Sequence, residues 1–357
     1  LAPDAQVTHK QQALLDQLAR IGRVEPERLL EPLSGPIWGY RRMARLGVRY
    51  VRKKGRVLVG FREPGSPMIA DIDTCPVLDP RVGEKLPALS EMIAGLDARR
   101  DIPQIEVGCG DGHCALAFRH MVPLGEADLA RLDAFAEEHG FAVFLQPGGP
   151  ETLAPLADGP RDVYPSYRLE DYDVEIRFSP LDFAQVNAEI NRRMVRQALD
   201  WLAVEPGDRV LDLFAGLGNF TLPLARCAGS AGSVTAVEAD EAMVARGAQS
   251  AAANGIDNTR HVVGDLFEPD PTHGWLRESF DRVLLDPPRA GAGAMMPVIA
   301  RMKPRRLVYV SCHPGSLARD VGQLVHEHGW RLVAAGVMDM FPHTAHVESM
   351  AVLEPRR

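Results

Sequence analysis

The chain has 357 residues, of which 46% are hydrophobic and 25% charged, a composition typical of a globular protein with two or three domains. No apolar run reaches about 18 residues, and the N-terminus lacks the layout of a secretory signal, so we expect neither membrane insertion nor export. The formal net charge of −8 argues against a protein that binds nucleic acid over its whole surface.

The cysteines point to a reducing compartment. Their number is odd and their spacing irregular, which does not predict a disulfide framework: Cys75, Cys109, Cys114, Cys227 and Cys312. We therefore expect a cytoplasmic protein, in which a special cysteine would be catalytic or metal-binding. The chain begins at Leu1 rather than Met, which suggests a fragment or a processed form, and we expect a monomer.

The first half of the chain mixes helices and strands without a clear βαβ repeat. Apolar spacing predicts a helix over 7–21, and two short apolar runs predict a hairpin over 46–51 and 56–61. Further patterns predict helices over 82–98 and 125–139, and strands near 104–107, 114–119 and 141–145. These elements indicate a small α+β domain.

A basic block covers the predicted hairpin. From Tyr40 to Arg62 the sequence has no Asp or Glu, and its basic residues include Arg41, Arg42, Arg45, Arg49, Arg52, Lys53, Lys54 and Arg56. Such a block can bind a phosphate backbone locally while the rest of the protein stays acidic. The alternative is a hairpin whose charges are merely solvated.

The second half alternates strands with helices. After a predicted helix over 187–202, apolar strand-like runs occur at 209–214, 233–237, 259–263, 281–285, 306–310 and 332–337. This order predicts a mostly parallel sheet covered on both faces. We place the domain boundary near residue 180, with residues 1–180 as the α+β domain and 181–357 as a Rossmann-like domain.

A glycine-rich turn follows the first of these strands. Gly216 and Gly218 let the backbone approach a nucleotide-like ligand, and Phe220 departs from the dinucleotide fingerprint. Glu238 ends the second strand, where it can accept ribose hydroxyls, and Asp265 follows the third, where it can meet an adenine amino group. With Asp212, this layout resembles the S-adenosylmethionine-binding half of class I methyltransferases, rather than an ordinary tight turn.

Cys312 ends an apolar strand and precedes a helix-like segment over 316–325. A thiolate that adds to C6 of a pyrimidine makes C5 able to attack a sulfonium methyl group. This position predicts an accessible thiol with a lowered pKa, although a lone cysteine can also be a small buried hydrophobe. The motif Asp286-Pro-Pro-Arg289 has no aromatic residue after its prolines, which argues against methylation of an exocyclic amine.

Glu348 is the candidate base that removes the C5 proton after methyl transfer. One alternative makes His343, His346 and Glu348 metal ligands. Another makes Glu348 a surface residue of a last strand.

Together these residues resemble the RNA uracil-5-methyltransferase family. The matching segments are Ser179–Asn187, Asp212–Phe220, Asp286–Arg289, Ser311-Cys312 with Leu317–Asp320, and Phe341–Glu348. The resemblance implies that Gln185, Phe214, Asn219, Glu238, Asp265 and Asp286 contact or adjoin the methyl donor. It also implies that Cys312 is the nucleophile, Glu348 the base, and a flipped-out uridine the target.

Within this family the chain is most similar to the bacterial enzymes that act on 23S ribosomal RNA. Thr74-Cys75-Pro76-Val77 resembles the segment that supplies the fourth cysteine of their [4Fe–4S] cluster. The other three cysteines and an RNA-binding TRAM domain would precede Leu1, and Cys75 alone can equally be a plain buried thiol. Three alternatives remain: a uridine in transfer RNA or elsewhere in ribosomal RNA, an RNA-binding module without catalysis, and a nicotinamide oxidoreductase.

Overall fold

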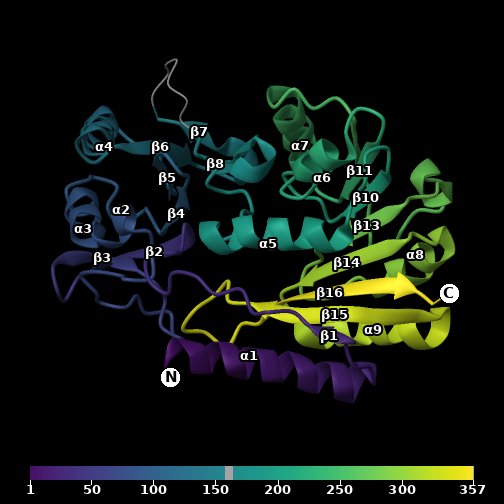
Figure 1. The fold of residues 1–357 in the computed structure, drawn as a ribbon. Coiled ribbons are helices and arrows are strands. Elements are labelled where there is room, and N and C mark those ends of the chain that lie inside the picture. Colours follow the sequence, from purple (N-terminus) through teal and green to yellow (C-terminus); the bar gives the residue numbers. More distant parts are fainter. Residues whose placement is uncertain (157–163, 357) are drawn as a thin grey trace. The chain divides into compact units, whose positions relative to one another are not determined.

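The computed structural model describes residues 1–156 and 164–356. It divides into two compact units (Figure 1). Unit 1 comprises Leu1–Gly35, Leu169–Ile176 and Glu189–Arg357, and unit 2 comprises Pro36–Arg168 and Arg177–Ala188.

Unit 1 is built on an eight-stranded sheet with the order β1-β15-β16-β14-β13-β10-β11-β12. Its strands are β1 (Arg28–Leu29), β10 (Arg209–Leu213), β11 (Ser233–Glu238), β12 (Thr259–Val263), β13 (Arg282–Leu285), β14 (Arg306–Ser311), β15 (Trp330–Met338) and β16 (Glu348–Pro355). The strands β10 to β14 are mutually parallel, whereas β16 runs antiparallel to both of its neighbours. The prediction of a mostly parallel, Rossmann-like sheet is confirmed.

The described residues of this part of the chain form the α-helices α1 (Pro3–Gln17), α5 (Ala188–Leu202), α6 (Thr221–Ala228), α7 (Glu241–Ala253), α8 (Met296–Met302) and α9 (Pro314–His328). Local signals set several of their ends. The Asp240 side chain accepts a hydrogen bond from the Met243 backbone nitrogen and so caps α7. Gly329 ends α9 in the left-handed conformation that glycine adopts without strain.

The N-terminal helix packs on unit 1, and this corrects its predicted place in a domain of residues 1–180. Leu14 and Leu18 are fully buried in the same apolar cluster as Leu317 and Val321 of α9. The short strand β1 also pairs in parallel with β15. Figure 1 shows α1 running alongside α9. Burial of the apolar face of α1 therefore assigns residues 1–35 to the second half of the chain. Helical periodicity predicts such a face but not the part of the protein on which it packs.

Unit 2 has a six-stranded sheet with the order β3-β2-β4-β5-β6-β7. Its strands are β2 (Met43–Val51), β3 (Arg56–Gly60), β4 (Gln104–Cys109), β5 (Cys114–Arg119), β6 (Phe141–Gln146) and β7 (Ala154–Pro155), and its helices are α2 (Pro80–Gly83), α3 (Leu86–Ala94) and α4 (Glu126–His139). The predicted hairpin is present as the antiparallel pair β2 and β3. The pair β5 and β6 is parallel and joined through α4, so unit 2 contains one βαβ connection.

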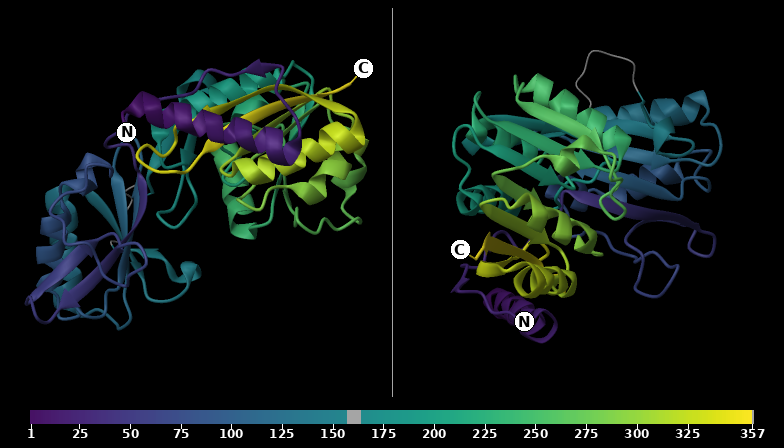
Figure 2. Two further views of the ribbon diagram at one scale, coloured as in Figure 1. Left: turned by 90° about the horizontal axis from the view of Figure 1, so that it is seen from below. Right: turned by 90° about the vertical axis from the view of Figure 1, so that its right-hand side faces the viewer.

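The core of unit 2 lies between this sheet and its helices. Figure 2 shows the sheet and the helices from two further directions. Leu46, Ile105 and Leu116 of the sheet are fully buried, as are Leu89 and Ile93 of α3. A separate two-stranded sheet is formed by β8 (Ser166–Leu169) and β9 (Val174–Arg177).

Candidate active site and RNA-binding surface

The predicted catalytic residues meet at one edge of the unit 1 sheet. Cys312 follows the last residue of β14, and Glu348 is the first residue of the antiparallel strand β16. Ser311 and Ser349 are direct partners in this ladder, and the Ser349 hydroxyl donates to the Ser311 carbonyl oxygen at 3.1 Å. Cys312 and Glu348 therefore adjoin this pair, at the edge where the parallel strands have their carboxyl ends.

The turn after β10 takes a conformation that suits close approach of a ligand. The backbone φ angle is +61° at Phe214, +55° at Gly216 and +94° at Gly218. A positive φ is unfavourable for phenylalanine, and such strain tends to occur where a backbone serves a ligand. The Gly216 nitrogen donates to Oε2 of Glu238 at 3.0 Å, which ties the turn to the end of β11.

Two carboxylates follow the next strand ends along the same edge. Glu238 is half-buried, and its Oε1 accepts from the backbone nitrogen of Asp240 at 3.1 Å. Asp265 is exposed, and its Oδ1 accepts from the Phe267 nitrogen at 2.8 Å. The rings of Phe214 and Phe267 meet edge to face with centroids 5.8 Å apart. Acidic and aromatic groups thus lie beside the turn, as binding of an adenosine would require.

Asp212 is a buried acid directly under the turn. Its Oδ2 accepts from the Thr221 hydroxyl at 2.6 Å, while its Oδ1 has no hydrogen-bond partner in the described part of the chain. Burial raises the pKa of this carboxyl to about 7. A buried acceptor without a partner fits a ligand that brings its own N–H donors or a positive charge, as S-adenosylmethionine does.

Asn219 shares a reciprocal amide pair with a residue that the sequence did not single out. Nδ2 of Asn191 donates to Oδ1 of Asn219 at 3.0 Å, and Nδ2 of Asn219 donates back at 2.9 Å. Asn191 lies on α5 and is fully buried. Its sequence signal is weak, because a single amide within an amphipathic helix is usually solvated.

The Cys312 thiol differs from its prediction in one respect. It is half-buried and accessible, but burial and the carboxylates of Glu348 and Asp286 raise its pKa to about 11, instead of lowering it. Arg289 acts in the opposite direction and lowers the pKa. The position at a strand end was predicted, but the surrounding acids depend on how the sheet is assembled.

The acids around Cys312 influence one another. Burial raises the pKa of Asp286 to about 7. Burial and the charge of Asp286 together raise the pKa of Glu348 well above its ordinary value. The three groups Asp286, Cys312 and Glu348 therefore form one electrostatic cluster, which favours a ligand that carries positive charge.

Both alternative interpretations of Glu348 are wrong. The side chain is not on the surface, because Glu348 is only 4% exposed. It is not grouped with His343 and His346 either, since both histidines are exposed and the one close set of metal-ligand atoms in the described residues lies elsewhere.

Gln185 lies in unit 2, so its predicted contact with the methyl donor remains a prediction. The residue is buried, and its backbone oxygen accepts from Nε of Arg42 at 2.7 Å. The guanidinium of Arg42 stacks over the Tyr167 ring at 4.3 Å from the centroid. Arg42 is thus an interior residue of unit 2, and its predicted role as a surface contact for RNA is wrong.

The other basic residues of the predicted RNA surface fall into two groups. In the first, the charge is already engaged: Arg41 stacks on Phe61, Arg45 pairs with Glu106, and Lys54 and Arg56 both pair with Asp71. These two cations lower the pKa of Asp71.

The second group comprises Arg49, Arg52 and Lys53, which are exposed at the end of β2 and in the turn after it. Arg49 has one long contact of 3.5 Å to the Pro67 carbonyl oxygen, and the described residues form no ion pair with Arg52 or Lys53. Two further cations, Arg99 and Arg100, lie over the ring of Tyr50 in β2 at 5.8 Å and 5.0 Å from its centroid. The positive charge that remains available to phosphate is concentrated at this tip.

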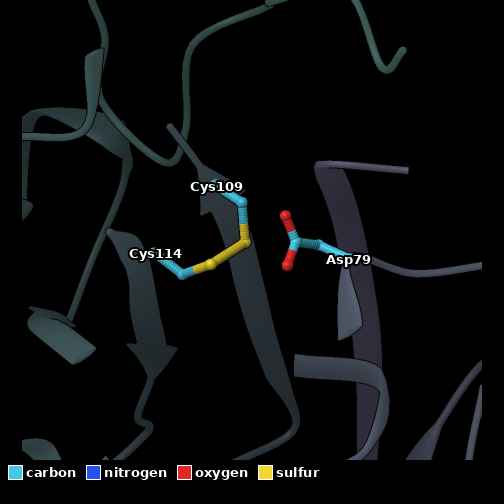
Figure 3. Close-up of side chains that lie close together, drawn as sticks. All are labelled: Asp79, Cys109 and Cys114. Atoms are coloured by element: carbon cyan, nitrogen blue, oxygen red, sulfur yellow. A yellow bond between two sulfur atoms is a disulfide. The ribbon is translucent and has the colours of Figure 1, made fainter. Parts of the chain in front are cut away.

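The sulfur chemistry of unit 2 differs from the prediction, because Cys109 and Cys114 form a disulfide. They are direct partners in the antiparallel pair of β4 and β5, which brings their side chains together. Asp79 lies against the disulfide (Figure 3), with its ligand oxygen and the two sulfurs within 4.8 Å of one another. Two bonded sulfurs leave no thiolate for a metal ion.

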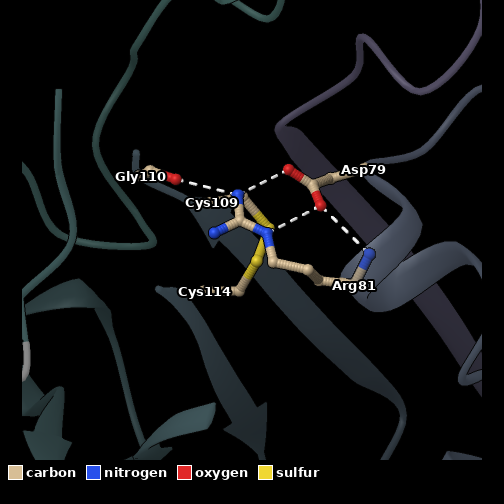
Figure 4. The surroundings of a disulfide bond; sticks show 5 residues. All are labelled: Asp79, Arg81, Cys109, Gly110 and Cys114. Atoms are coloured by element: carbon tan, nitrogen blue, oxygen red, sulfur yellow. Dashed lines mark hydrogen bonds and ion pairs between the residues drawn. A yellow bond between two sulfur atoms is a disulfide. The ribbon is translucent and has the colours of Figure 1, made fainter. Parts of the chain in front are cut away.

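The charge of Asp79 is also neutralised by Arg81. Arg81 donates to both of its oxygens, at 2.9 Å and 2.6 Å, and to the Gly110 carbonyl oxygen at 2.8 Å (Figure 4). Of the unit 2 cysteines, this leaves Cys75, which is half-buried against the apolar core. A [4Fe–4S] cluster needs four thiolates, so the described residues of this chain do not fit such a cluster by themselves.

The described helices include no candidate for a membrane span. The parallel sheet, the strained glycine turn and the acids at its strand ends define a class I S-adenosylmethionine-dependent methyltransferase. Two family models agree with this class. One, described as a methyltransferase domain, matches residues 204–311, and one described as tRNA (Uracil-5-)-methyltransferase matches residues 276–356.

Relatives identify the family more closely. The chain is 56% identical over 354 residues to a protein of Alkalilimnicola ehrlichii and 51% identical over 356 residues to one of Xanthomonas axonopodis pv. citri. Both are named 23S rRNA (uracil(1939)-C(5))-methyltransferase RlmD, and the matches cover 99% and 100% of this chain and 79% of each relative. The chain belongs to this family of RNA (uracil-C5)-methyltransferases.

A solved structure agrees with the family assignment. The tRNA (uracil-54, C5)-methyltransferase of Pyrococcus abyssi, in complex with S-adenosyl-L-homocysteine, is 25% identical with a TM-score of 0.75. The match covers 99% of this chain and 84% of that structure. The predicted enzyme class and its methyl donor are thereby confirmed.

Proposed function

We propose that the protein methylates C5 of a uridine in 23S ribosomal RNA, with Cys312 as nucleophile and Glu348 as base. The observation that carries this mechanism is the β14–β16 ladder, which brings the two residues beside the paired Ser311 and Ser349. The names of the 50–56% identical relatives support the choice of 23S ribosomal RNA.

The covalent step begins at the thiol. The Cys312 thiol gives its proton to solvent and the thiolate sulfur bonds to C6 of the uracil, while the electron pair of the C5–C6 double bond moves to make C5 nucleophilic. S-adenosylmethionine supplies the methyl group and, when bound, a positive sulfonium charge. C5 forms the new bond to the methyl carbon as the bond from that carbon to sulfur breaks.

Glu348 completes the reaction. Its carboxylate takes the proton from C5, the C5–C6 double bond re-forms, and the bond from Cys312 to C6 breaks. Glu348 must be ionised to do this, although burial favours its protonated form. A positive charge beside the cluster of Asp286 and Glu348 offsets that effect. The carboxylates of Asp286 and Glu348 thus favour binding of the positively charged donor, and the bound donor favours their ionised forms.

The donor and the RNA are assigned to different residues. The groups of unit 1 proposed to hold the donor are Phe214, Gly216, Gly218, Asn219, Glu238, Asp265 and Asp286. For Gln185 of unit 2, the family resemblance remains the sole support. We infer that Arg49, Arg52 and Lys53 bind RNA phosphates, because their charge is the least engaged of the basic block. We further infer that the enzyme acts as a monomer in the cytoplasm.

The decisive experiment incubates the protein with labelled methyl donor and unmodified ribosomal RNA, followed by nucleoside analysis. We expect 5-methyluridine in the 23S fraction. Cys312→Ala should lower turnover by more than about 10³-fold. Cys227→Ala is the matched control, because Cys227 is also a half-buried free thiol but lies on α6. Turnover within tenfold of wild type in Cys312→Ala would contradict the mechanism.

A second candidate substrate is transfer RNA. It is favoured by the TM-score of 0.75 to an enzyme named for transfer RNA. The same assay on separated RNA fractions decides between them: label in transfer RNA but not in 23S ribosomal RNA would replace the first substrate with the second.

A further inference from the structure

The loop after β13 is hydrogen-bonded to a buried carboxylate of α9. Asp320 is fully buried, and its Oδ2 accepts from the Tyr309 hydroxyl and from the Ala292 backbone nitrogen, both at 2.7 Å. Tyr309 belongs to β14 and Ala292 to the loop. One carboxylate therefore joins a strand, a helix and a loop.

Arg319 provides a second attachment. Its Nε donates to Oδ1 of Asp320 at 2.8 Å, and its Nη2 donates to the Ala290 carbonyl oxygen at 2.9 Å. The two neighbouring residues of α9 thus grip the loop backbone on either side of Gly291. We call Tyr309, Arg319 and Asp320 the loop clamp.

Gly291 shows how closely the loop rests on the clamp. Its φ angle is +81°, and a Cβ atom there would lie 2.6 Å from Oδ2 of Asp320 and 2.7 Å from Nη2 of Arg319. Such a side chain would have to displace the loop or the clamp. Gly293 differs: a Cβ at this position meets Oδ1 of Asp320 at 3.4 Å, an ordinary contact.

The clamped loop follows the Asp286-Pro-Pro-Arg289 motif, which begins at the end of β13, and β13 is the neighbour of β14, whose end carries Cys312. Asp286 and Arg289 both act on Cys312, the first opposing ionisation of the thiol and the second favouring it. Arg289 is exposed and lies next to Ala290, the residue whose carbonyl Arg319 holds. The position of this cation relative to the thiol therefore depends on the clamp.

We propose that Asp320, with Tyr309 and Arg319, is a positioning residue for methyl transfer, which holds the 290–292 backbone and so fixes the position of the neighbouring Arg289 relative to Cys312. Asp320 acts through the loop and touches no substrate. The inference rests on the proposed role of Cys312 as nucleophile.

The first test compares Gly291→Ala with Gly293→Ala in the full chain. Alkylation of Cys312 by iodoacetamide is followed by mass spectrometry of its peptide across pH 7 to 11, which separates it from Cys75 and Cys227. We expect Gly291→Ala to slow alkylation at pH 8 by about twofold to threefold, since half a unit of raised pKa removes roughly two thirds of the thiolate. The kcat should fall with it and the KM for the methyl donor should not, while Gly293→Ala resembles wild type.

The second test asks whether the effect passes through Arg289. Asp320→Asn, Tyr309→Phe and Arg289→Gln should each raise the apparent pKa of Cys312. Combining Asp320→Asn with Arg289→Gln should add little to Arg289→Gln alone, because the two substitutions remove the same interaction. Tyr309→Phe removes one of the hydrogen bonds to Asp320 and keeps the ring, so it serves if Asp320→Asn fails to fold.

The proposal is overturned if folded Gly291→Ala and Tyr309→Phe proteins alkylate at Cys312 with the wild-type pH profile. Fully additive effects of Asp320→Asn and Arg289→Gln would overturn it too. Alkylation reports the surroundings of the thiol without methyl transfer. Failure of the proposed function would appear elsewhere, as retained turnover in Cys312→Ala.

Discussion

The sheet edge of unit 1 and the basic hairpin of unit 2 were both inferred from residue patterns. They differ in how well the sequence pattern predicts where the side chains lie in the fold. At the sheet edge, each motif follows a strand, and parallel strands bring their carboxyl ends together whatever the details of packing. In the hairpin, the charges are near one another in sequence, but Asp71 and Glu106 from elsewhere in unit 2 engage Lys54, Arg56 and Arg45. Motifs at strand ends are therefore more reliable guides to a site than charge density.

The largest expected effect is at the sheet edge. Glu348→Gln removes the base and keeps the size of the side chain, so turnover should fall by about 10²–10⁴-fold. Because the Cys312–C6 bond breaks after proton removal, the methylated RNA should stay attached and migrate with the protein in a denaturing gel. Adding Cys312→Ala should abolish the adduct. A Glu348→Gln protein that turns over without any adduct would remove Glu348 as the base.

The next effect tests the assignment of α1 to unit 1. Nζ of Lys10 pairs with Oδ1 of Asp339 at 2.7 Å and donates to the Phe341 carbonyl oxygen at 2.8 Å, with both side chains buried. Lys10→Met leaves a buried carboxylate without its cation and should lower the free energy of unfolding by about 3 kcal/mol. Chemical denaturation measures this loss. The double variant with Asp339→Asn should recover part of it, and a loss below about 1 kcal/mol would contradict the pairing.

The hairpin should respond more weakly and in a graded way. Replacing Arg49, Arg52 and Lys53 together by Gln should weaken RNA binding by about tenfold and reduce the salt dependence of the affinity. Replacing Arg45, Lys54 and Arg56 by Gln removes the same number of charges, but these are already paired with acids. Binding assays at several salt concentrations compare the two triple variants. Equal losses in both would show that the ion pairs do not decide which cations meet RNA.

The smallest expected effect is that of Asp286→Asn, which should stabilise the folded protein but lower its activity. Asp286 has a pKa of about 7 in the folded chain and an ordinary value near 4 when unfolded. Between these values the folded chain binds more protons, so the contribution of Asp286 to stability falls as pH rises and is fully unfavourable above pH 7.

Asp286→Asn should therefore raise the melting temperature of the donor-free protein at pH 8 by about a few degrees, with little change at pH 4. Methyl transfer should fall, because Asp286 is one of the groups proposed to hold the methyl donor. Thermal unfolding at both pH values measures the difference. A lower melting temperature at pH 8 than in wild type would contradict the burial of an ionised Asp286.

The sequence alone determined the elements whose signals are local. The apolar strands from Arg209 to Val310, the turn at Gly216 and Gly218, and the hairpin around Lys54 follow from residue types at short range. Gly218 tolerates its φ of +94° because it has no Cβ, which is a property of the residue itself. Cys312 could be assigned to a strand end because the apolar run before it is also a local signal.

The tertiary structure decided which distant segments meet. Only the insertion of β16 between β14 and β15 brings Glu348 to the edge where Cys312 lies. Docking of α1, pairing of Cys109 with Cys114, and the burial that raises the thiol pKa depend equally on long-range contacts. The residues that predict a strand do not specify which strand lies next to it, because backbone hydrogen bonding is common to all residues. The choice of neighbouring strand comes from the apolar surface that the whole chain buries.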